Sequence, residues 1–352
     1  MEWNGRIESF ISLGNFLRDF LDEKGRRVDP LFSELEDAIT RSGLMNSWFT
    51  CEFIEHVLQA WTVNLRKEEL EKWLEPYASQ LNGHAPGMNV AVIMAGNIPL
   101  VGFHDFLSVL LSGNKFTGRL SSDDTELLPA LARILVHFNS GWEDNITFTK
   151  EPLTRFDAVI ATGSNNSAHY FNYYFSKVPH IIRKNRNGIA IITGDENDQE
   201  LAGLADDIFI YFGLGCRNIS KLYFPAGYNV EPLLNAFRRY INFSMHHKWM
   251  NNHDYYRSVF LLNQIPALDN GFVLMTENKA IASPPAVLYY EYYKDMKDLL
   301  DELSMQKDEI QIVVCKKEIP LPFCRPGQAQ SPGLSDYADG IDTLQFLFGL
   351  HK

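Results

Sequence analysis

The feature that most constrains the fold is a regular alternation of short apolar runs and helical segments between residues 88 and 225. The apolar runs are typical of strands that are buried on both faces of a parallel sheet. The segments between them have the spacing of helices of about 10 to 20 residues, which predicts right-handed βαβ units. The sequence therefore indicates an α/β fold with mainly parallel sheets flanked by helices. The runs are "NVAVIMAGN", "KFTGRL", "FDAVIATG", "GIAIITG" and "NISKLYFP".

The first 85 residues have a different character and read as helical, with apolar residues three and four apart in "IESFISLGNFLRDFL". Further along, Asp123 and Glu126 have the spacing of a capping box at the start of the helix in "SSDDTELLPALARILVHF". The last third contains another helix in "VEPLLNAFRRYINF", a strand in "IQIVVC" and an irregular loop in "CRPGQAQSPGLSDYADG".

Composition excludes several classes of partner. With 32 basic and 44 acidic residues the net charge is −12, which argues against broad binding to nucleic acid or to an anionic membrane. No run approaches the roughly 20 apolar residues that span a bilayer, and the first residues lack the pattern of a secretory signal. The four cysteines have no paired short spacing, so we expect no disulfide framework and a cytoplasmic location.

Three short stretches carry groups suited to chemistry. Cys216 follows Gly215 in "GLGCRN", a polar and flexible setting that predicts a presented thiol rather than a packed one. Asn97 follows the strand-like run "NVAVIMAG". Gly163 and Ser164 open a helix after "FDAVIAT", where free backbone N–H groups suit a phosphate, although plain helix capping explains the same residues.

Taken in order, the segments from about residue 88 to 225 resemble the aldehyde dehydrogenase superfamily. They are "GNIPLVGFHDFLSVLLSGNKFTGRLSSDD", "FDAVIATGS" and "NGIAIITGDENDQELAGLADDIFIYFGLGCRNISKLYFP". The most similar subgroup is the acyl-CoA reductases of the bioluminescence fatty-acid reductase type, whose C-terminal stretch resembles "GQAQSPGLSDYADGIDTLQFL". The resemblance implies an aldehyde-dehydrogenase-like fold of two domains. Residues 1–87 would be a helical part of the cofactor domain, 88–183 its dinucleotide-binding core, 184–325 the catalytic domain and 326–352 a C-terminal segment.

The resemblance also implies roles for single residues. Cys216 would be the nucleophile, and Asn97 would donate to the oxyanion of the tetrahedral intermediate. Arg119 stands where the superfamily usually has a lysine near the adenine ribose, and an arginine there favours NADPH over NADH. The remaining cofactor-binding residues would be Gly96, Gly163 and Ser164.

One departure from the superfamily points to the reaction class. Enzymes that oxidise aldehydes carry a glutamate upstream of the cysteine that activates water, whereas the corresponding region "HIIRKNRNG" contains no carboxylate. An acyl-enzyme there would exchange with a thiol such as coenzyme A instead of being hydrolysed. The basic residues of this region either face a phosphate of CoA or of the cofactor, or form a solvated loop. They are Arg183, Lys184 and Arg186.

The function implied is NAD(P)H-dependent reduction of an acyl-CoA to an aldehyde through an acyl-cysteine, by a protein that could form homo-oligomers. One alternative is a dehydrogenase acting on a free aldehyde or an acyl phosphate. Another is a non-catalytic binding protein, because the Glu-Phe-Gly-Pro-like segment that holds the nicotinamide ribose in most of the superfamily is missing. His104 and His180 are candidate general acids by their nearness to matched segments.

Three other kinds of site are not favoured. His246, His247 and His253 lie near Asp254, but further ligands are distant in sequence, so a polar helix face or loop is preferred to a metal site. No G-x-S-x-G motif of a serine hydrolase is present. The aromatic runs "YFNYYF" and "LYYEYY" have helical spacing and are read as core or interface rather than as an acyl-chain tunnel.

Overall fold

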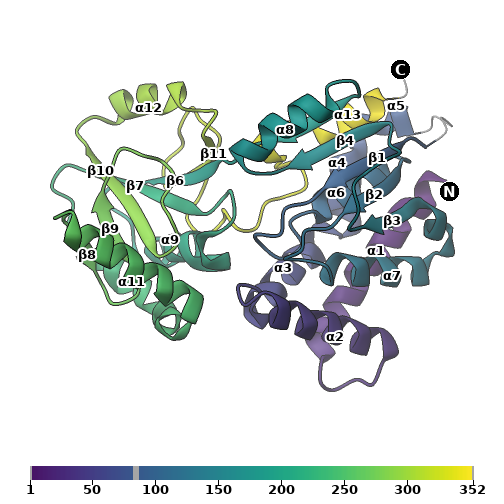
Figure 1. Cartoon of the computed structure of the whole chain (residues 1–352), viewed down its shortest axis with the longest axis horizontal. Helices are drawn as coiled ribbons and strands as arrows, with labels where there is room; N and C mark the ends of the chain where they lie inside the picture. The colour runs from purple at the N-terminus through teal and green to yellow at the C-terminus, as the bar shows by residue number, and fades with distance from the viewer. Residues whose placement is uncertain (1, 82–86, 351–352) are drawn as a thin grey trace. The chain divides into compact units, whose positions relative to one another are not determined.

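The computed structural model describes residues 2–81 and 87–350, and the chain divides into two compact units (Figure 1). The first unit contains residues 1–184 and 333–352, and the second contains residues 185–332. The sequence placed these boundaries at 183/184 and 325/326. Residues 326–332 belong to the second unit, because the carboxylate of Asp207 accepts hydrogen bonds from the backbone N–H groups of Gly327 and Ala329.

The first unit is built on a parallel sheet of five strands in the order β3-β2-β1-β4-β5. The five runs predicted as strands form β1, β2 and β4 here and β6 and β7 in the second unit, and the predicted strand "IQIVVC" forms β11 there. Strands β3 and β5 were not predicted. The strands of the first unit are β1 (Asn89–Ile93), β2 (Lys115–Arg119), β3 (Ile146–Thr149), β4 (Ala158–Thr162) and β5 (His180–Arg183).

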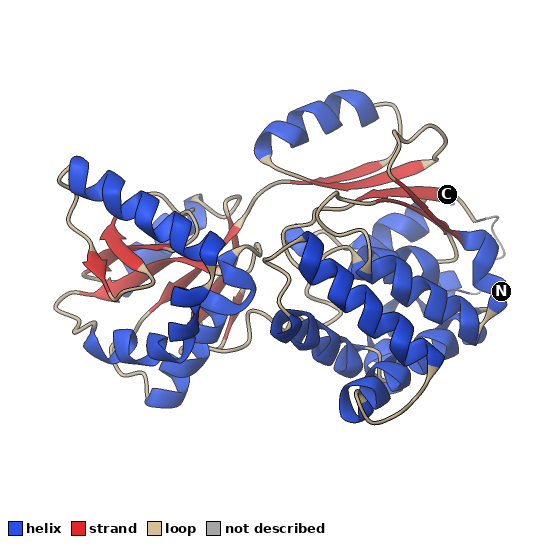
Figure 2. Cartoon of the chain, turned by 60° about the horizontal axis from the view of Figure 1, so that its bottom comes forward, coloured by secondary structure: helices blue, strands red, loops and turns tan. Residues whose placement is uncertain are grey.

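Alternate side chains of β1 enter two different cores, as the period of a strand requires. Val90 and Val92 belong to a large apolar core with the N-terminal helices. Ala91 and Ile93 belong to a smaller core on the other face, with Phe171 of α8 (Asn165–Phe175) packed against it. Figure 2 shows α8 on one side of this sheet and the N-terminal helices on the opposite side. The central strand is therefore buried on both faces.

The N-terminal region is helical, as predicted, and contributes to the large core. The capping box predicted at Asp123 and Glu126 is wrong. Helix α7 begins at Leu127 and the side chain of its N-cap Glu126 makes no capping hydrogen bond, because that carboxylate binds Arg41 instead. The helices of this unit besides α8 are α1 (Trp3–Glu23), α2 (Pro30–Met45), α3 (Cys51–Asn64), α4 (Lys67–Leu74), η1 (Glu75–Tyr77), α5 (Ala78–Leu81), α6 (Phe103–Leu111), α7 (Leu127–Phe138), η2 (Ser140–Asn145), η5 (Ala338–Gly340) and α13 (Thr343–Gly349).

The second unit contains a sheet of seven strands in the order β12-β11-β6-β7-β10-β9-β8. All neighbouring pairs are parallel except β8 and β9. The run "LYYEYY", read from the sequence as an aromatic run of helical spacing, lies in the strand β10. The strands are β6 (Asn187–Ile191), β7 (Ile219–Pro225), β8 (Leu268–Asp269), β9 (Leu274–Glu277), β10 (Val287–Tyr293), β11 (Ile310–Cys315) and β12 (Phe323–Cys324).

Helices cover both faces of this second sheet (Figure 1). On one face, Leu299 and Leu303 of α12 pack against Ile189 and Ile191 of β6. On the other face, Phe209 at the end of α9 lies at the centre of an aromatic cluster with rings from α10, η4 and α11. The helices are α9 (Asp198–Phe209), η3 (Ile210–Gly213), α10 (Glu231–Phe237), η4 (Arg238–Met245), α11 (His247–Leu262) and α12 (Met296–Met305).

A buried ion pair ties β5 to α6 in the first unit. Nη1 and Nη2 of Arg183 donate to the two carboxylate oxygens of Asp105 at 2.6 and 2.9 Å, and Nη2 also donates to the hydroxyl of Thr343 at 3.0 Å. Both charged side chains are only 7% exposed. A charge this deeply buried depends on its partner for compensation.

We predict that Asp105→Ala lowers the free energy of unfolding of the first unit by about 3–5 kcal/mol, because it leaves the Arg183 guanidinium buried without its counter-ion. Tryptophan fluorescence during urea unfolding is a suitable measurement, since five of the six tryptophans lie in this unit. The double variant Asp105→Leu/Arg183→Met should recover most of the loss, and an equally unstable double variant would contradict the explanation. The five tryptophans are Trp3, Trp48, Trp61, Trp73 and Trp142.

Candidate active site

In the first unit, the candidate cofactor residues gather at one edge of the sheet. Strand β1 lies between β2 and β4, and Ile93 is in register with Arg119 at the end of β2. Asn97, in the loop after β1, is exposed. Gly163 and Ser164 follow β4 directly. The carboxyl ends of neighbouring parallel strands meet at one edge, so the structure brings these predicted residues to the same side of the sheet.

The loop that carries Asn97 is held by the segment after β2. A Cβ atom on Gly96 would lie only 2.5 Å from the Ser121 hydroxyl oxygen, so this position accepts only glycine without a shift of its neighbours. Leu100 adopts a left-handed backbone with φ of 55°, and its N–H donates to the Asp124 carboxylate at 3.3 Å. Burial raises the pKa of Asp124 to about 6, although backbone N–H groups oppose this rise.

Ser164 caps helix α8. Its hydroxyl oxygen accepts a hydrogen bond from the Ser167 N–H at 3.2 Å, which is the capping explanation considered for this motif. A Cβ on Gly163 would come within 2.9 Å of the Phe171 ring and 3.0 Å of the Ser167 Cβ. Gly163 therefore allows the helix to begin close against the end of β4.

In the second unit, Cys216 lies in a turn between η3 and the amino end of β7, and its side chain is exposed. The chain reaches this turn through Tyr211, Phe212 and Gly213, which have φ angles of 59°, 54° and 67°. The left-handed region is costly for the two non-glycine residues. The backbone before the cysteine is thus sharply bent, and the sequence prediction of an exposed thiol is confirmed.

The side chain of Asn218 holds this bend. Its amide nitrogen donates to the carbonyl oxygens of Asp207 and Ile210 at 3.0 and 2.8 Å, and its amide oxygen accepts from the Gly215 N–H at 2.8 Å. The residue is buried. Carbonyl groups at the end of a helix need such donors, because they have no partner within the helix. Asn218 therefore joins the end of α9 to the turn that presents Cys216.

Two functional candidates in this region were missed from the sequence. Asp207 lies on α9 among the apolar residues Leu204 and Ile208 and is fully buried. An acidic residue within the apolar stripe of a helix is a signal that sequence reasoning could have used. Asn218 carries no comparable signal, because a polar residue before a strand reads as an ordinary turn.

The predicted basic site is corrected in part. Arg183 is buried and paired with Asp105, so its guanidinium is committed inside the first unit and does not serve as a phosphate ligand. Lys184 is exposed, and Arg186 donates to the carbonyl oxygen of Lys307 at 3.4 Å. Roles of the last two residues toward a phosphate stay predictions.

The candidate general acid His104 is half-buried. Its Nε2 atom lies 2.9 Å from the carbonyl oxygen of Leu334, and its ring lies against Trp73 and Tyr337. Burial lowers the pKa of this histidine, which favours its neutral form. His180 is half-buried at the start of β5, with its Nδ1 atom 2.8 Å from the Val178 carbonyl oxygen.

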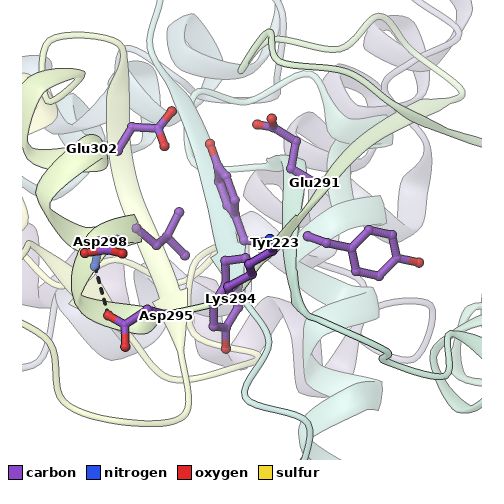
Figure 3. A pocket seen from close by; sticks show the side chains of 9 residues that line it. Tyr223, Glu291, Lys294, Asp295, Asp298 and Glu302 are labelled. Carbon is purple, nitrogen blue, oxygen red and sulfur yellow. Dashed lines mark hydrogen bonds between the residues drawn. The ribbon is translucent and has the colours of Figure 1, made fainter.

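A separate pocket of about 190 Å³ opens in the second unit at the carboxyl ends of β7 and β10 (Figure 3). Cys216 precedes the amino end of β7, so this pocket belongs to the opposite edge of the sheet. Its acidic lining does not suit a nucleotide or CoA phosphate. The acidic residues are Glu291, Asp295, Asp298 and Glu302.

The described residues hold neither a metal-site cluster nor a membrane-spanning helix. No cluster of three or more histidine, cysteine or acidic side chains in residues 2–81 and 87–350 has the arrangement of a metal site. His253, one of the three histidines considered, is buried between Asp254 and Asp269. Within the same described ranges, no helix has the length and apolar character needed to cross a bilayer.

Comparison with known proteins identifies the family. Residues 34–231, more than half of the chain and including both Asn97 and Cys216, match the acyl-CoA reductase (LuxC) family. The chain belongs to this family. A long-chain acyl-protein thioester reductase of Aliivibrio fischeri is 23% identical over 188 residues, which are 49% of this chain and 39% of that protein. The chain thus aligns with well under half the length of this relative.

Solved structures give the fold. Aldehyde dehydrogenase 21 of Physcomitrella patens, in complex with succinate, matches with a TM-score of 0.69 at 12% identity, over 99% of this chain and 84% of that one. An aldehyde dehydrogenase of Bacillus cereus in complex with NAD⁺ matches with a TM-score of 0.63 at 12% identity, over 91% and 73%. This LuxC family member therefore has the aldehyde-dehydrogenase-like α/β fold that its sequence predicted.

We predict that ionisation of Asp124 destabilises the first unit as the pH rises. In the folded protein its pKa of about 6 lies above the ordinary 3.8, so the folded state retains a proton that the unfolded chain loses first. The stabilisation that this group contributes is complete below about pH 4, and it is lost as the pH rises through about 6. Melting temperatures measured across pH 4–7.5 should fall more steeply for the wild type than for Asp124→Asn.

The control for this experiment is Asp123→Asn, which removes the exposed carboxylate next in the chain. This variant should retain the wild-type pH dependence. If Asp124→Asn and the wild type showed parallel curves across this range, the raised pKa would be refuted.

Proposed function

We propose that the protein reduces an acyl-CoA thioester to an aldehyde with a nicotinamide cofactor, through an acyl group held covalently on Cys216. The observation that carries the proposal is the exposed thiol of Cys216, at a bent turn inside the segment that matches the LuxC family. A thiol in such a position can meet a substrate carbonyl, whereas the buried Cys315 cannot.

The first chemical step is transfer of the acyl group. The Cys216 thiolate attacks the thioester carbonyl, an S–C bond forms, and the tetrahedral intermediate expels the thiolate of coenzyme A. We propose that the side-chain amide of Asn97 donates to the oxyanion of that intermediate, together with the backbone N–H of Cys216. Such a donor is worth about 2.7–4 kcal/mol of the barrier.

The fate of the acyl-enzyme follows from the segment where aldehyde-oxidising members of the superfamily carry their water-activating glutamate. The segment 180–188 holds no carboxylate, and the carboxylate of Asp105, which contacts this segment, is neutralised by Arg183. Hydrolysis of the thioester is therefore slow, and a thiol or a hydride donor is the effective acceptor. This supports a reductase rather than an enzyme that oxidises aldehydes to acids.

The residues at the edge of the first sheet fit a dinucleotide. The strand order β3-β2-β1-β4-β5 is that of a doubly wound nucleotide-binding sheet, and α8 begins directly beyond β4. Gly96, Gly163 and Ser164 would hold the pyrophosphate, and Arg119 could pair with a 2′-phosphate, which favours NADPH over NADH. The reduced nicotinamide supplies the hydride. Cys216 then leaves as a thiolate when the aldehyde is released.

The acyl donor has an alternative. The relative from Aliivibrio fischeri is named as a reductase of acyl-protein thioesters, so an acyl group on a protein thiol is a second candidate substrate. The attack by Cys216 is the same for both donors. The two are separated by supplying one donor at a time.

We predict that incubation with a medium-chain or long-chain acyl-CoA adds one acyl mass to the protein, and that Cys216→Ala removes the adduct. Intact-mass spectrometry without cofactor traps the intermediate, because no hydride donor is present. Cys51→Ala is the matched control, since Cys51 is also exposed. Addition of NADPH or NADH should release the adduct as aldehyde.

An acyl mass that persists in Cys216→Ala would contradict the role of Cys216. No adduct from any acyl-CoA or protein thioester, together with no saturable binding of NADH or NADPH by fluorescence, would favour a non-catalytic protein. Faster release by water than by added thiol would favour an aldehyde dehydrogenase.

We predict that Asn97→Ala lowers kcat about 100-fold to 1,000-fold, since a donor that acts mainly on the tetrahedral intermediate is lost. KM for the acyl-CoA should change little. Asn172→Ala is a suitable control. The Asn172 side chain is exposed, and its amide nitrogen donates to the Ala168 carbonyl oxygen one turn earlier in the same helix. An Asn97→Ala variant that retains wild-type kcat would exclude this residue from the oxyanion site.

A further inference from the structure

The segment 325–330 of the second unit is held against helix α9 by two hydrogen bonds to one buried carboxylate. The two carboxylate oxygens of Asp207 accept hydrogen bonds from the N–H groups of Gly327 at 2.6 Å and Ala329 at 2.8 Å. The backbones approach closely here, since a Cβ on Gly203 would lie 2.9 Å from the Gly327 nitrogen. Gly327 itself has φ of 85°, which glycine adopts without strain.

The same segment also holds the turn that presents Cys216. Nε of Arg217 donates to the carbonyl oxygen of Ala329 at 2.7 Å. The Ala329 residue is therefore fixed on both sides of its backbone, by Asp207 through its N–H and by Arg217 through its C=O. A carboxylate in α9 is thus connected to the residue that follows the cysteine.

The backbone of Asp207 also connects α9 to the turn that presents Cys216 and to the segment 325–330. The carbonyl oxygen of Asp207 accepts from the amide nitrogens of Asn218 at 3.0 Å and Gln330 at 3.2 Å. Asp207 is fully buried, and burial raises the pKa of its carboxyl to about 7. A carboxylate is costly at such a position, and the two N–H groups of the segment are the donors that offset the cost.

We propose that Asp207 is a positioning residue for Cys216: its carboxylate fixes the segment 325–330, whose Ala329 carbonyl anchors the side chain of Arg217, the residue that follows the cysteine. The role rests on the proposed function of Cys216 as the nucleophile. An anchored cation next to a cysteine favours the thiolate, which is the reactive form. Without Asp207 the segment moves, Arg217 loses its acceptor, and the thiol ionises at higher pH.

The neighbouring Asp206 allows two effects of Asp207 on the pKa of the Cys216 thiol to be distinguished: positioning of Arg217, and the direct effect of the negative charge. Asp206 precedes Asp207 on α9 and is bound by the Tyr240 hydroxyl and by Arg239, not by the segment 325–330. Removal of either negative charge would, by the field alone, lower the pKa of a nearby thiol. Loss of positioning raises it instead. The two explanations therefore predict opposite signs for an Asp207 variant.

The test is the pH dependence of alkylation by iodoacetamide, followed at each cysteine by peptide mass spectrometry. In Asp207→Asn we expect the midpoint for Cys216 to move upward by about one pH unit. The exposed Cys51 is the internal reference and should not change. The buried Cys315 reports unfolding, because it becomes labelled only when the second unit opens. Asp206→Asn should leave the midpoint unchanged or lower it.

Arg217→Met provides an independent variant and should also move the midpoint upward, at least as far as Asp207→Asn does. The double variant should show no upward shift beyond that of Arg217→Met, because both changes break the same connection. Arg217→Met with a wild-type midpoint would overturn the proposal, even if Asp207→Asn failed to fold. A downward shift in folded Asp207→Asn would overturn it as well. No acyl donor is used, so a failure of the proposed function would leave these results intact.

Discussion

The constraint on which the candidate active site depends is the need to satisfy carbonyl groups at the buried end of α9. The helix ends inside the second unit, and the chain then bends through three residues with positive φ before it reaches Cys216. Asn218 supplies the missing donors with one amide nitrogen and receives the Gly215 N–H with its oxygen. Since unsatisfied buried carbonyls are costly, the bend and its exposed thiol are specified by one side chain.

A related principle organises the first unit. The loop after β1 contains a leucine in a left-handed conformation, and the half-buried Asp124 carboxylate accepts its N–H. In each unit a polar side chain withdrawn from solvent, rather than a helix or strand, fixes the loop that carries a candidate functional group. Local backbone strain of this kind persists only where the surroundings determine it, and such loops are suited to hold reactive groups in one geometry.

Much of the architecture was predictable because strands buried on both faces leave a clear apolar signal. The runs around Val92, Ile160 and Ile189 were identified correctly for that reason. Strand β5 was missed because its arginine suggested a solvated loop, whereas Asp105 neutralises Arg183 inside the core. Strand β10 was missed because aromatic residues at "LYYEYY" fit either period.

The sequence by itself determined the α/β class, the family resemblance and the exposure of Cys216, because these depend on local pattern and on motif order. The tertiary structure alone decided which polar and charged side chains are buried and bound to other parts of the protein. Whether Arg183 or His104 faces solvent, and whether Asp207 is buried against segment 325–330, depends on contacts between residues 78 to 230 positions apart along the chain. Pairings at such separations leave no periodic trace, so only the folded chain reveals them.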